Sequence, residues 1–279
     1  MSESAVNLPV DFQNVQAHYD LCDEFFALFL DPSRTYSCAK FDKPESTLAE
    51  AQLAKIDLSL GKCEIQPGQR LLDIGCGWGA ASLRAANNYG AQVTGLTLSQ
   101  NQLAYCQKLA AKQPRVNFRL QGWETFEEKV DRIVSIGAFE HFGRDKYAAF
   151  FARCHDILAT DGVMLLHTIT LGKPSKAFAF LRFVHFISVK IFPGGDVPPP
   201  ERVVEFARAA GFELVHAESL RLHYAKTLDC WAANLSAAKE AAVALVGQVI
   251  FDTYMKYLTS CANYFRSGEC NVYQFKFRV

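Results

Sequence analysis

Residues 71 to 79 read Leu-Leu-Asp-Ile-Gly-Cys-Gly-Trp-Gly, and this stretch decides the fold. Two apolar residues lead into Asp73, and glycines then follow at positions 75, 77 and 79. The apolar run predicts a buried strand, and the glycines predict a tight turn directly after it. Because Gly75 and Gly77 lack a Cβ atom, a ligand can lie against the backbone at the carboxyl end of this strand.

The spacing of these glycines indicates which type of nucleotide cofactor such a turn binds. A dinucleotide site has its third glycine three positions after the second, and an acidic residue about twenty positions further on. Here the third glycine follows after two positions, and the next expected strand, Gln92 to Thr97, ends without an acid. The loop therefore matches class I S-adenosylmethionine-dependent methyltransferases better than an NAD site, with another nucleotide or a plain turn as alternatives.

Composition describes a globular protein with a large apolar interior. The chain has 279 residues, enough for one or two domains, and half of them are hydrophobic, including 22 Phe. A hydrophobic core alone usually needs fewer Phe residues, and an apolar ligand would explain the surplus. Formal net charge is zero, so the bulk electrostatics do not favour a nucleic acid partner.

The cysteines and the first residues bear on the compartment. Nine cysteines are scattered without a C-x-x-C pair, which favours reduced thiols over disulfides or a zinc site. Met1 to Val10 carries one acid, Glu3, and no basic region, unlike a secretory signal. The apolar stretch Phe178 to Phe192 is interrupted by charges and is too short to span a bilayer. We expect a cytoplasmic protein without a metal site, able to touch a lipid surface.

From Arg70 onward, strand-like runs alternate with helix-like runs, which predicts a mostly parallel sheet with helices on both faces. Strands are expected at 70–75, 92–97, 116–121, 130–136, 162–168, 212–220 and 271–278. Helices are expected at 79–89, 99–112, 145–158, 201–210 and about 227–265, with Asp161-Gly162 as a turn. The predicted fold is a class I S-adenosylmethionine-dependent methyltransferase, a Rossmann-like α/β fold with a seven-stranded sheet.

Short motifs of unusual composition follow one another along the chain. They are His18-Tyr19-Asp20, Phe29 to Pro32, Thr35 to Ala39, Leu72 to Gly79, Gly95 to Ser99, Ser135 to Gly143, Met164 to Ile169, Ile191 to Gly195, His223 to Leu228 and Tyr257 to Cys261. In this order they resemble the mycolic acid cyclopropane synthase branch of the cyclopropane-fatty-acyl-phospholipid synthase family, from about residue 13 onward. Relatives in this branch make cyclopropanes, methyl branches or hydroxylated methyl branches on long acyl chains. Between Thr170 and Phe178 the chain is shorter than the mycolate enzymes.

The domain organisation follows from the pattern and the resemblance together. Val15 to Leu30 has aromatic residues at helical spacing, and it would either fold over the cofactor or only dock on the core. We expect an N-terminal helical lid segment at 1–69 and a methyltransferase domain at 70–279, with an acyl-site insertion at about 169–200. In that insertion, Phe178 to Phe192 is either a wall of the acyl channel or an ordinary buried helix.

The expected cofactor-binding residues combine the loop with matched family motifs. They are Tyr36, Ser37, Asp73, Gly75, Gly77, Thr97, Gln102, Trp123, Glu124 and Ile136. The loop glycines would admit the methionine part of S-adenosylmethionine, and Thr97 with Gln102 would take the ribose in place of the missing acid. Trp123 and Glu124 resemble the family's pair at the adenine edge, although Trp123 can also be a core aromatic residue.

The resemblance also implies a bicarbonate ion beside the reacting carbons. Its ligands would be Cys38, Glu140, His167 and Tyr224, with the backbone amide of Ile136 as a further donor. A small oxyanion suits the reaction because it can take a proton from a carbocation without bonding to it. Outside this pattern, His167 would be a satisfied core histidine and Cys38 an inert buried thiol.

Cys261 is a second candidate for a catalytic cysteine, because family descriptions assign one at its motif. It lies in a helical run in which a packing role is natural. The aromatic faces of Phe139, Phe142, Tyr36 and Tyr224 would stabilise a carbocation by about 1 kcal/mol each when dry.

The predicted function is transfer of a methylene or methyl group from S-adenosylmethionine to the double bond of an unsaturated acyl chain. The substrate is expected as an acyl-lipid or on an acyl carrier protein, with peripheral membrane contact as an option. One alternative is a related methyltransferase that makes methyl or hydroxymethyl branches or acts on a smaller, non-mycolate acceptor. Another is a lipid-binding protein on the same scaffold, without turnover.

Overall fold

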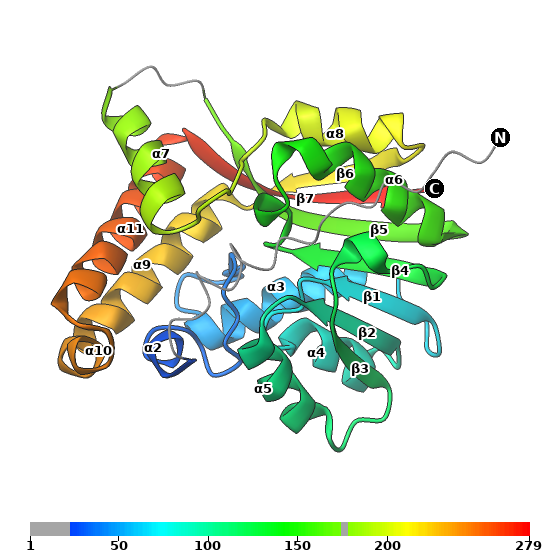
Figure 1. Cartoon of the computed structure of the whole chain (residues 1–279), viewed down its shortest axis with the longest axis horizontal. Coiled ribbons are helices and arrows are strands. Elements are labelled where there is room, and N and C mark those ends of the chain that lie inside the picture. Colours follow the sequence, from blue (N-terminus) through cyan, green and yellow to red (C-terminus); the bar gives the residue numbers. More distant parts are fainter. Residues whose placement is uncertain (1–22, 174–177) are drawn as a thin grey trace.

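The computed structural model of the chain describes residues 23–173 and 178–279, and its centre is a seven-stranded sheet (Figure 1). The strands are β1 (Arg70–Ile74), β2 (Gln92–Thr97), β3 (Val116–Leu120), β4 (Val130–Ile136), β5 (Leu158–Leu171), β6 (Glu213–Ser219) and β7 (Cys270–Arg278). Their order is β3-β2-β1-β4-β5-β7-β6, and β7 runs antiparallel to both of its neighbours. The predicted seven-stranded, mostly parallel sheet is confirmed.

The central strands β1 and β4 are largely buried because helices cover both faces of the sheet. Leu71 of β1 packs on the face that carries α3 (Leu48–Lys62), α4 (Ala80–Asn88) and α5 (Gln100–Ala110). The next residue, Leu72, packs on the opposite face against α6 (Tyr147–Ile157) and α8 (Pro200–Ala209). Each strand therefore contributes alternate side chains to two separate cores.

A third core joins the remaining helices, which lie together beyond one end of the strands (Figure 1). These helices are α2 (Asp23–Ala27), α7 (Phe178–Lys190), α9 (Arg221–Ala237), α10 (Lys239–Val246) and α11 (Gln248–Ser267). Ring contacts hold α2 here, since Phe25 lies 5.0 Å from Tyr254 between ring centroids. This group of helices faces the loop after β1, because Trp78 belongs to the same core.

The predicted element boundaries need three corrections. The predicted helical region 227–265 is helical but divides into α9, α10 and α11, with breaks at Ala238 and at Gly247, whose φ is 82°. Strand β5 starts at Leu158, and Asp161-Gly162 lies inside it as an irregularity where the register with β4 shifts. Helix α3 was not predicted, although Thr47 and Glu50 form a capping box at its start.

The N-terminal prediction can be followed only in part. Residues 15–22 of the predicted helix lie outside the described residues, and α2 is the part that the structure describes. Within 23–69, α2 belongs to the third core while α3 packs on the sheet. The division at residue 69 and the lid role stay predictions.

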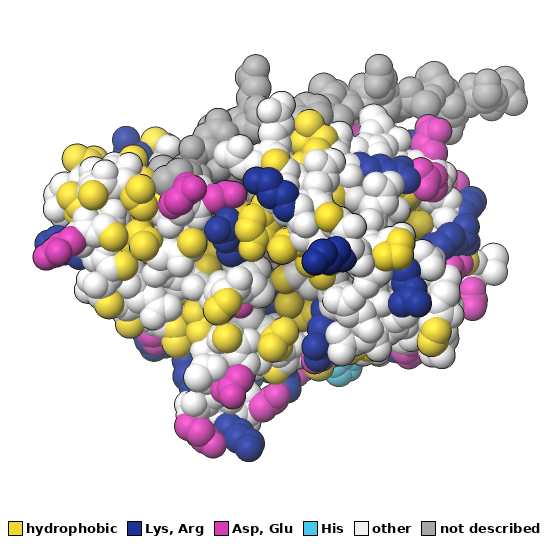
Figure 2. Space-filling model, turned by 90° about the horizontal axis from the view of Figure 1, so that it is seen from below, with side chains coloured by type: hydrophobic (Ala, Val, Ile, Leu, Met, Phe, Trp, Pro, Cys, Tyr) yellow, Lys and Arg dark blue, Asp and Glu magenta, His cyan; other side chains and the backbone are white. Residues whose placement is uncertain are grey.

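The surface of the described residues combines apolar and charged side chains. Figure 2 shows hydrophobic side chains exposed in several groups, with Lys and Arg between them and Asp and Glu on the same face. Over 23–173 and 178–279, no helix combines the length and apolar character that crossing a bilayer requires.

Candidate active site

Three hollows meet at the carboxyl ends of β1, β2 and β4. The first pocket has about 90 Å³ and the second about 70 Å³, and Gly75 and Gly77 line both of them. The third is a large cavity of about 340 Å³ between the sheet and the group of helices around α9 and α11. Gly137, directly after β4, lines all three, so ligands in the pockets and the cavity would come together there.

The two inner glycines of the loop are required for different reasons. Gly75 has φ of 77°, and a Cβ atom on it would lie 2.3 Å from the Cβ atom of Ala138. Gly77 has φ of 55°, but a Cβ atom there would meet no described atom within 4 Å. Gly75 therefore lets the loop pack against the chain after β4, whereas Gly77 leaves open space beside the pockets.

Thr97 and Gln102 meet at the first pocket, and their predicted contact with the ribose stays a prediction. The hydroxyl of Thr97 donates to Oε1 of Gln102 over 2.7 Å and accepts from the backbone N–H of Ser99 over 3.1 Å. These bonds hold the Gln102 side chain by its oxygen. The NH₂ group of Gln102 is left to donate to a hydroxyl of a ligand.

Trp123 and Glu124 line the same pocket from the 3₁₀ turn Trp123–Thr125. Trp123 is buried and its ring contacts Phe150 at 5.3 Å, so it is both a core residue and a pocket wall. Glu124 pairs with Lys146 over 3.3 Å through Oε1, while its buried Oε2 has no hydrogen-bond partner among the described residues. A ligand with an N–H group at this point would satisfy that oxygen.

Two buried charged groups, Asp73 and Lys55, line the second pocket. Asp73 accepts from the Ser82 hydroxyl over 2.6 Å. Burial raises the pKa of Asp73 to about 6, against the Ser82 hydrogen bond and the charge of Lys55. Lys55 donates to the Ser37 hydroxyl over 2.7 Å, and burial lowers the pKa of Lys55 to about 8. This pocket therefore suits a ligand that carries its own charges.

The N-terminal segment reaches the large cavity because it is tied to α9. The backbone N–H of Ala39 donates to the Thr227 hydroxyl over 3.0 Å, and that of Phe41 donates to Nδ1 of His223 over 3.1 Å. Cys38 and Tyr224, far apart in the sequence, consequently line one cavity.

Aromatic side chains form much of the wall of the large cavity. The Tyr36 hydroxyl donates a hydrogen bond to the Tyr257 hydroxyl over 3.2 Å. Tyr224 packs on Phe265 with ring centroids 4.7 Å apart. Helix α7 closes another side, with Phe183, Val184, Ile187 and Ser188 among the lining residues. The predicted apolar wall at 178–192 is therefore present, although several of its side chains are exposed on the other side.

Glu140 is the buried acid of the cavity. Its Oε1 accepts from the backbone N–H of Ile169 over 2.6 Å, whereas the buried Oε2 lacks a partner in the described part of the chain. Burial raises the pKa of Glu140, against the hydrogen bond from Ile169. An unpartnered buried carboxyl oxygen beside a cavity indicates a ligand that completes its hydrogen bonding.

His167 lines the same cavity from β5. Its Nδ1 lies 3.3 Å from Nε2 of Gln274, and its buried Nε2 is without a partner among residues 23–173 and 178–279. Burial lowers the pKa of His167, and the charges of Lys55 and Lys62 lower it further. The imidazole is therefore neutral at physiological pH. Because its Nε2 is unpartnered, His167 is not the satisfied core histidine of the alternative interpretation.

The two candidate cysteines both line the cavity as protonated thiols. Cys38 is fully buried and donates to the backbone oxygen of Ala39 over 3.2 Å. Burial raises the pKa of Cys38, and burial also raises the pKa of Cys261 on α11. A nucleophilic cysteine needs a lowered pKa, so neither thiol is activated for covalent chemistry.

Ile136 ends β4 beside His167 of the neighbouring strand and lines the second pocket. Its predicted role as a backbone donor to an anion stays a prediction. In the residues that the structure describes, no group of three or more His, Cys, Asp or Glu could hold a metal ion.

The structure brings further residues to the site that were not predicted. They are Lys55, Lys62, Lys146, Tyr257 and Gln274. Lys55, Ser59 and Lys62 recur at intervals of four and three along α3, which places them on one face of that helix. This spacing was the available signal, but polar residues at helical spacing normally indicate a solvent-exposed face.

The sheet order, the glycine loop after β1 and the pockets at the strand ends define the class I S-adenosylmethionine-dependent methyltransferases. The chain belongs to the mycolic acid cyclopropane synthetase family, whose sequence profile matches residues 7–275.

Relatives of known name are similar over almost the whole chain. Cyclopropane mycolic acid synthase 1 of Mycobacterium tuberculosis is 54% identical over 275 residues, which cover 95% of this chain and 96% of that protein. The solved structure of the cyclopropane synthase MmaA2 from Mycobacterium tuberculosis is 52% identical with a TM-score of 0.95, covering 97% of this chain and 99% of that chain. The mycolic acid cyclopropane synthase CmaA1, solved in complex with SAH and CTAB, has the same identity and TM-score and covers 98% and 99%.

Proposed function

We propose that this enzyme transfers the methyl carbon of S-adenosylmethionine to the double bond of an unsaturated acyl chain and closes a cyclopropane ring. The observation that carries the proposal is the aromatic cavity with unpartnered Glu140 and His167, which meets the cofactor pockets at Gly137. A volume of about 340 Å³ and an apolar wall suit part of an acyl chain. The relatives' names point to the same reaction.

The reaction needs one carbon and the loss of one proton. The alkene electron pair attacks the sulfonium methyl group, the bond from sulfur to carbon breaks, and S-adenosylhomocysteine leaves with the bonding electrons. The resulting carbocation loses a proton from the transferred methyl group, and the carbon–hydrogen electron pair closes the ring. Tyr36, Tyr224 and Tyr257 line the cavity in which the positive charge would develop, and their faces would stabilise it.

We place S-adenosylmethionine across the two smaller pockets. The first pocket offers an unpartnered acceptor on Glu124 for the adenine amino group and the NH₂ group of Gln102 for the ribose. In the second pocket, the carboxylate of Asp73 would face the ammonium group and the positively charged sulfur of the cofactor. Lys55 would face the carboxylate of the cofactor. Opposite charges on ligand and protein would then compensate one another in a buried site.

We also propose that Cys38, Glu140, His167 and Tyr224 hold a bicarbonate ion, which when bound supplies the base for the departing proton. An unpartnered Nε2 on His167 and Oε2 on Glu140 fit such a group, because a small oxyanion with a hydroxyl both accepts and donates hydrogen bonds. The raised pKa of Glu140 limits the repulsion between its carboxyl group and an anion. The protonated thiol of Cys38 would be a further weak donor.

Helix α7 suggests where the acyl chain comes from. Its cavity side carries Phe183 and Ile187, while Phe178, Leu181 and Val189 on it are 74%, 57% and 51% exposed. All of its charged side chains are basic or histidine. We propose that this helix rests on a bilayer that contains anionic lipids and presents the acyl chain to the cavity.

A vesicle experiment tests the role of α7. The wild-type protein should sediment with vesicles containing anionic lipid and less with neutral vesicles, and Leu181→Ser should weaken this binding. The matched control is Leu53→Ser, which changes an exposed leucine on α3. Equal sedimentation of wild type and Leu181→Ser would contradict the proposal and favour an acyl carrier protein as the source of the substrate.

The reaction itself is tested with methyl-labelled S-adenosylmethionine and an extract of lipids and acyl carriers. We expect mass spectrometry to show one added CH₂ on an unsaturated acyl chain with its double bond lost. The same addition with the double bond retained would indicate methyl branching, and label on small molecules would indicate a different acceptor. Cofactor binding without any transfer would indicate a lipid-binding protein, and each of these results would overturn ring closure.

A further inference from the structure

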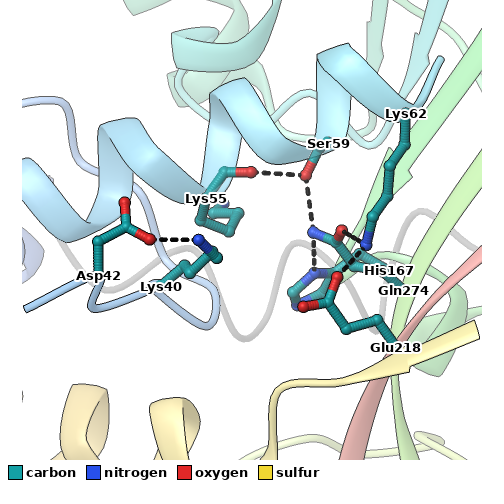
Figure 3. A network of polar contacts seen from close by, with 8 residues as sticks. All are labelled: Lys40, Asp42, Lys55, Ser59, Lys62, His167, Glu218 and Gln274. Carbon is teal, nitrogen blue, oxygen red and sulfur yellow. Dashed lines mark hydrogen bonds and ion pairs between the residues drawn. The ribbon is translucent and has the colours of Figure 1, made fainter. Parts of the chain in front are cut away.

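A line of polar contacts runs from Glu218 through Lys62 and Gln274 to His167 (Figure 3). Glu218 on β6 pairs with Lys62 on α3, and Lys62 Nζ donates to Oε1 of Gln274 on β7 over 2.7 Å. Nε2 of Gln274 then faces Nδ1 of His167 at 3.3 Å and the Ser59 hydroxyl at 2.9 Å. Four separate elements of the fold therefore meet behind the imidazole ring.

The chemistry of Lys62 decides which way the Gln274 amide points. An ammonium group only donates hydrogen bonds, so the atom of Gln274 that faces it must be the oxygen. The NH₂ group consequently faces Ser59 and His167. Ser59 is free to accept from it, because its own hydroxyl hydrogen goes to the backbone oxygen of Lys55 over 2.8 Å. A reversed amide would place two donors against each other at Lys62.

The amide orientation in turn decides the tautomer of His167. Because Gln274 donates to Nδ1, that nitrogen must be unprotonated, and the ring proton of a neutral imidazole then lies on Nε2. Nε2 is the atom without a partner among the described residues, on a side chain that lines the large cavity. The side chains of Gln274 and Ser59 are fully buried, so water does not compete with these bonds.

We propose that Lys62 and Gln274 are positioning residues that lock His167 as a neutral Nε2–H donor toward the cavity. His167 then binds an oxyanion or orients a carboxyl group, and it does not act as the base that removes the proton. This inference rests on the proposed function, because the donor matters only if the cavity holds such a group. It assigns catalytic importance to two residues that do not line the cavity themselves.

The surrounding charges act in the same direction. Lys55 and Lys62 face His167 from α3, and Glu218 lies on the far side of Lys62. Two ammonium groups nearby disfavour a positively charged imidazolium. The proposal therefore predicts one protonation state of His167 across the physiological pH range.

Substitutions at two positions separate an effect on the tautomer from general damage to the fold. Gln274→Glu keeps the size of the side chain and retains an acceptor for Lys62, but it places a carboxylate against Nδ1 and reverses the proton preference of the ring. Lys62→Met removes the group that orients the amide, and Lys62→Arg restores a donor. Lys276→Met is the matched control, since Lys276 is as buried as Lys62, lies two residues from Gln274 on β7 and pairs instead with Glu64.

The tautomer is measured with ¹⁵N-labelled histidine and long-range proton–nitrogen correlation, with His167 assigned from its loss in His167→Asn. We expect Nδ1 unprotonated and Nε2 protonated in the wild-type protein and in Lys276→Met, with no change between about pH 6 and pH 9. Gln274→Glu should protonate Nδ1, and Lys62→Met should give a mixture of tautomers. Protonated Nδ1 in the wild type, or an unmixed Nε2–H tautomer in Lys62→Met, would overturn the proposal.

Turnover provides the second readout. Hydrogen bonds that orient metal-bound histidines contribute roughly 10- to 100-fold to activity, and by analogy we expect Gln274→Glu to lower kcat by about that factor with KM for S-adenosylmethionine unchanged. Lys62→Arg should retain most of the turnover that Lys62→Met loses. Full turnover in Gln274→Glu with a reversed tautomer would refute the catalytic part. If the wild type transfers no methyl group, the proposed function fails while the tautomer result still stands.

Discussion

The two smaller pockets and the large cavity meet at Gly137, but their polar groups are bonded differently. In the pockets, Thr97 bonds to Gln102 and Asp73 to Ser82, close in sequence, while Lys55 bonds to Ser37 and Glu124 to Lys146 across longer separations. In the cavity, Glu140 and His167 each keep one buried polar atom without a partner in the described ranges. The comparison teaches that bonds within the protein already hold most named polar groups of the pockets, although Glu124 Oε2 also lacks a partner among the described residues, whereas Glu140 and His167 of the cavity both depend on a ligand.

The largest expected effect concerns Gly75 and tests how strongly the loop after β1 depends on its backbone geometry. Gly75→Ala adds a Cβ atom 2.3 Å from that of Ala138 at a positive φ. Clash and backbone strain together should lower the free energy of unfolding by about 2 to 5 kcal/mol. Gly77→Ala is the matched control, because its added atom meets open space and only the strain of about 1 to 2 kcal/mol remains.

Urea unfolding of both variants, together with titration of S-adenosylmethionine, separates the two glycines. Gly77→Ala should lose mainly cofactor affinity, since its added methyl group enters the space beside both pockets. Equal loss of stability in the two variants would contradict the assignment of packing to Gly75 and of ligand space to Gly77.

The next effect concerns the unpartnered acid of the cavity. Glu140→Gln keeps the shape of the side chain but removes its titratable group, so turnover should fall by about 100-fold or more. Cofactor affinity should stay within a few fold, because Glu140 lines the cavity and not the two smaller pockets. Single-turnover kinetics with labelled cofactor measure both quantities. Glu128→Gln, on the surface, is the control, and wild-type turnover in Glu140→Gln would remove this residue from the mechanism.

A smaller effect concerns Asp73 and pH. Burial raises the pKa of Asp73 from 3.8 to about 6, so the folded state binds the proton more tightly than the unfolded state. The resulting loss of stability grows as pH rises from about 4 to about 6 and is complete above that range. Asp73→Asn removes this cost and should stabilise the cofactor-free protein by about 2 kcal/mol more at about pH 8 than at about pH 4.5.

Urea unfolding at both pH values, with and without S-adenosylmethionine, checks this prediction. Adding the cofactor should restore the advantage of the wild type, because its positive charges compensate the carboxylate. A difference between Asp73→Asn and wild type that does not depend on pH would mean that Asp73 is ionised freely in the folded protein.

The smallest expected effect concerns Cys261. Burial raises the pKa of this thiol, so it is protonated and serves only as part of the cavity wall. Cys261→Ser should therefore change turnover by less than about 2-fold in the labelled-methyl assay. A loss as large as that of Glu140→Gln would indicate covalent catalysis by Cys261. It would contradict the comparison, because the cavity would then supply a reactive group of its own instead of depending on a ligand.

Elements with a strong local pattern were predicted accurately. The bounds of β2 and β4 agree with the sequence-based prediction, because both are short apolar runs between clear turn signals. Helix α3 was missed because Gln52, Lys55 and Ser59 are polar yet buried, the first two bonded to Ser37 and the third to Gln274 of the sheet. The region 227–265 was predicted to be helical without its internal boundaries, because only Gly247 gives a local signal for the turns that fold α9 back against α11.

The sequence by itself determined the class of fold and predicted a nucleotide-binding loop after β1. The glycines at positions 75, 77 and 79 act through their own backbone, so their spacing carries the information directly. Only the tertiary structure decided which atoms of the cavity are left without partners and how Lys62 reaches His167 through Gln274. The reason is that burial and hydrogen-bond direction depend on which distant segments meet, and a linear pattern does not contain those contacts.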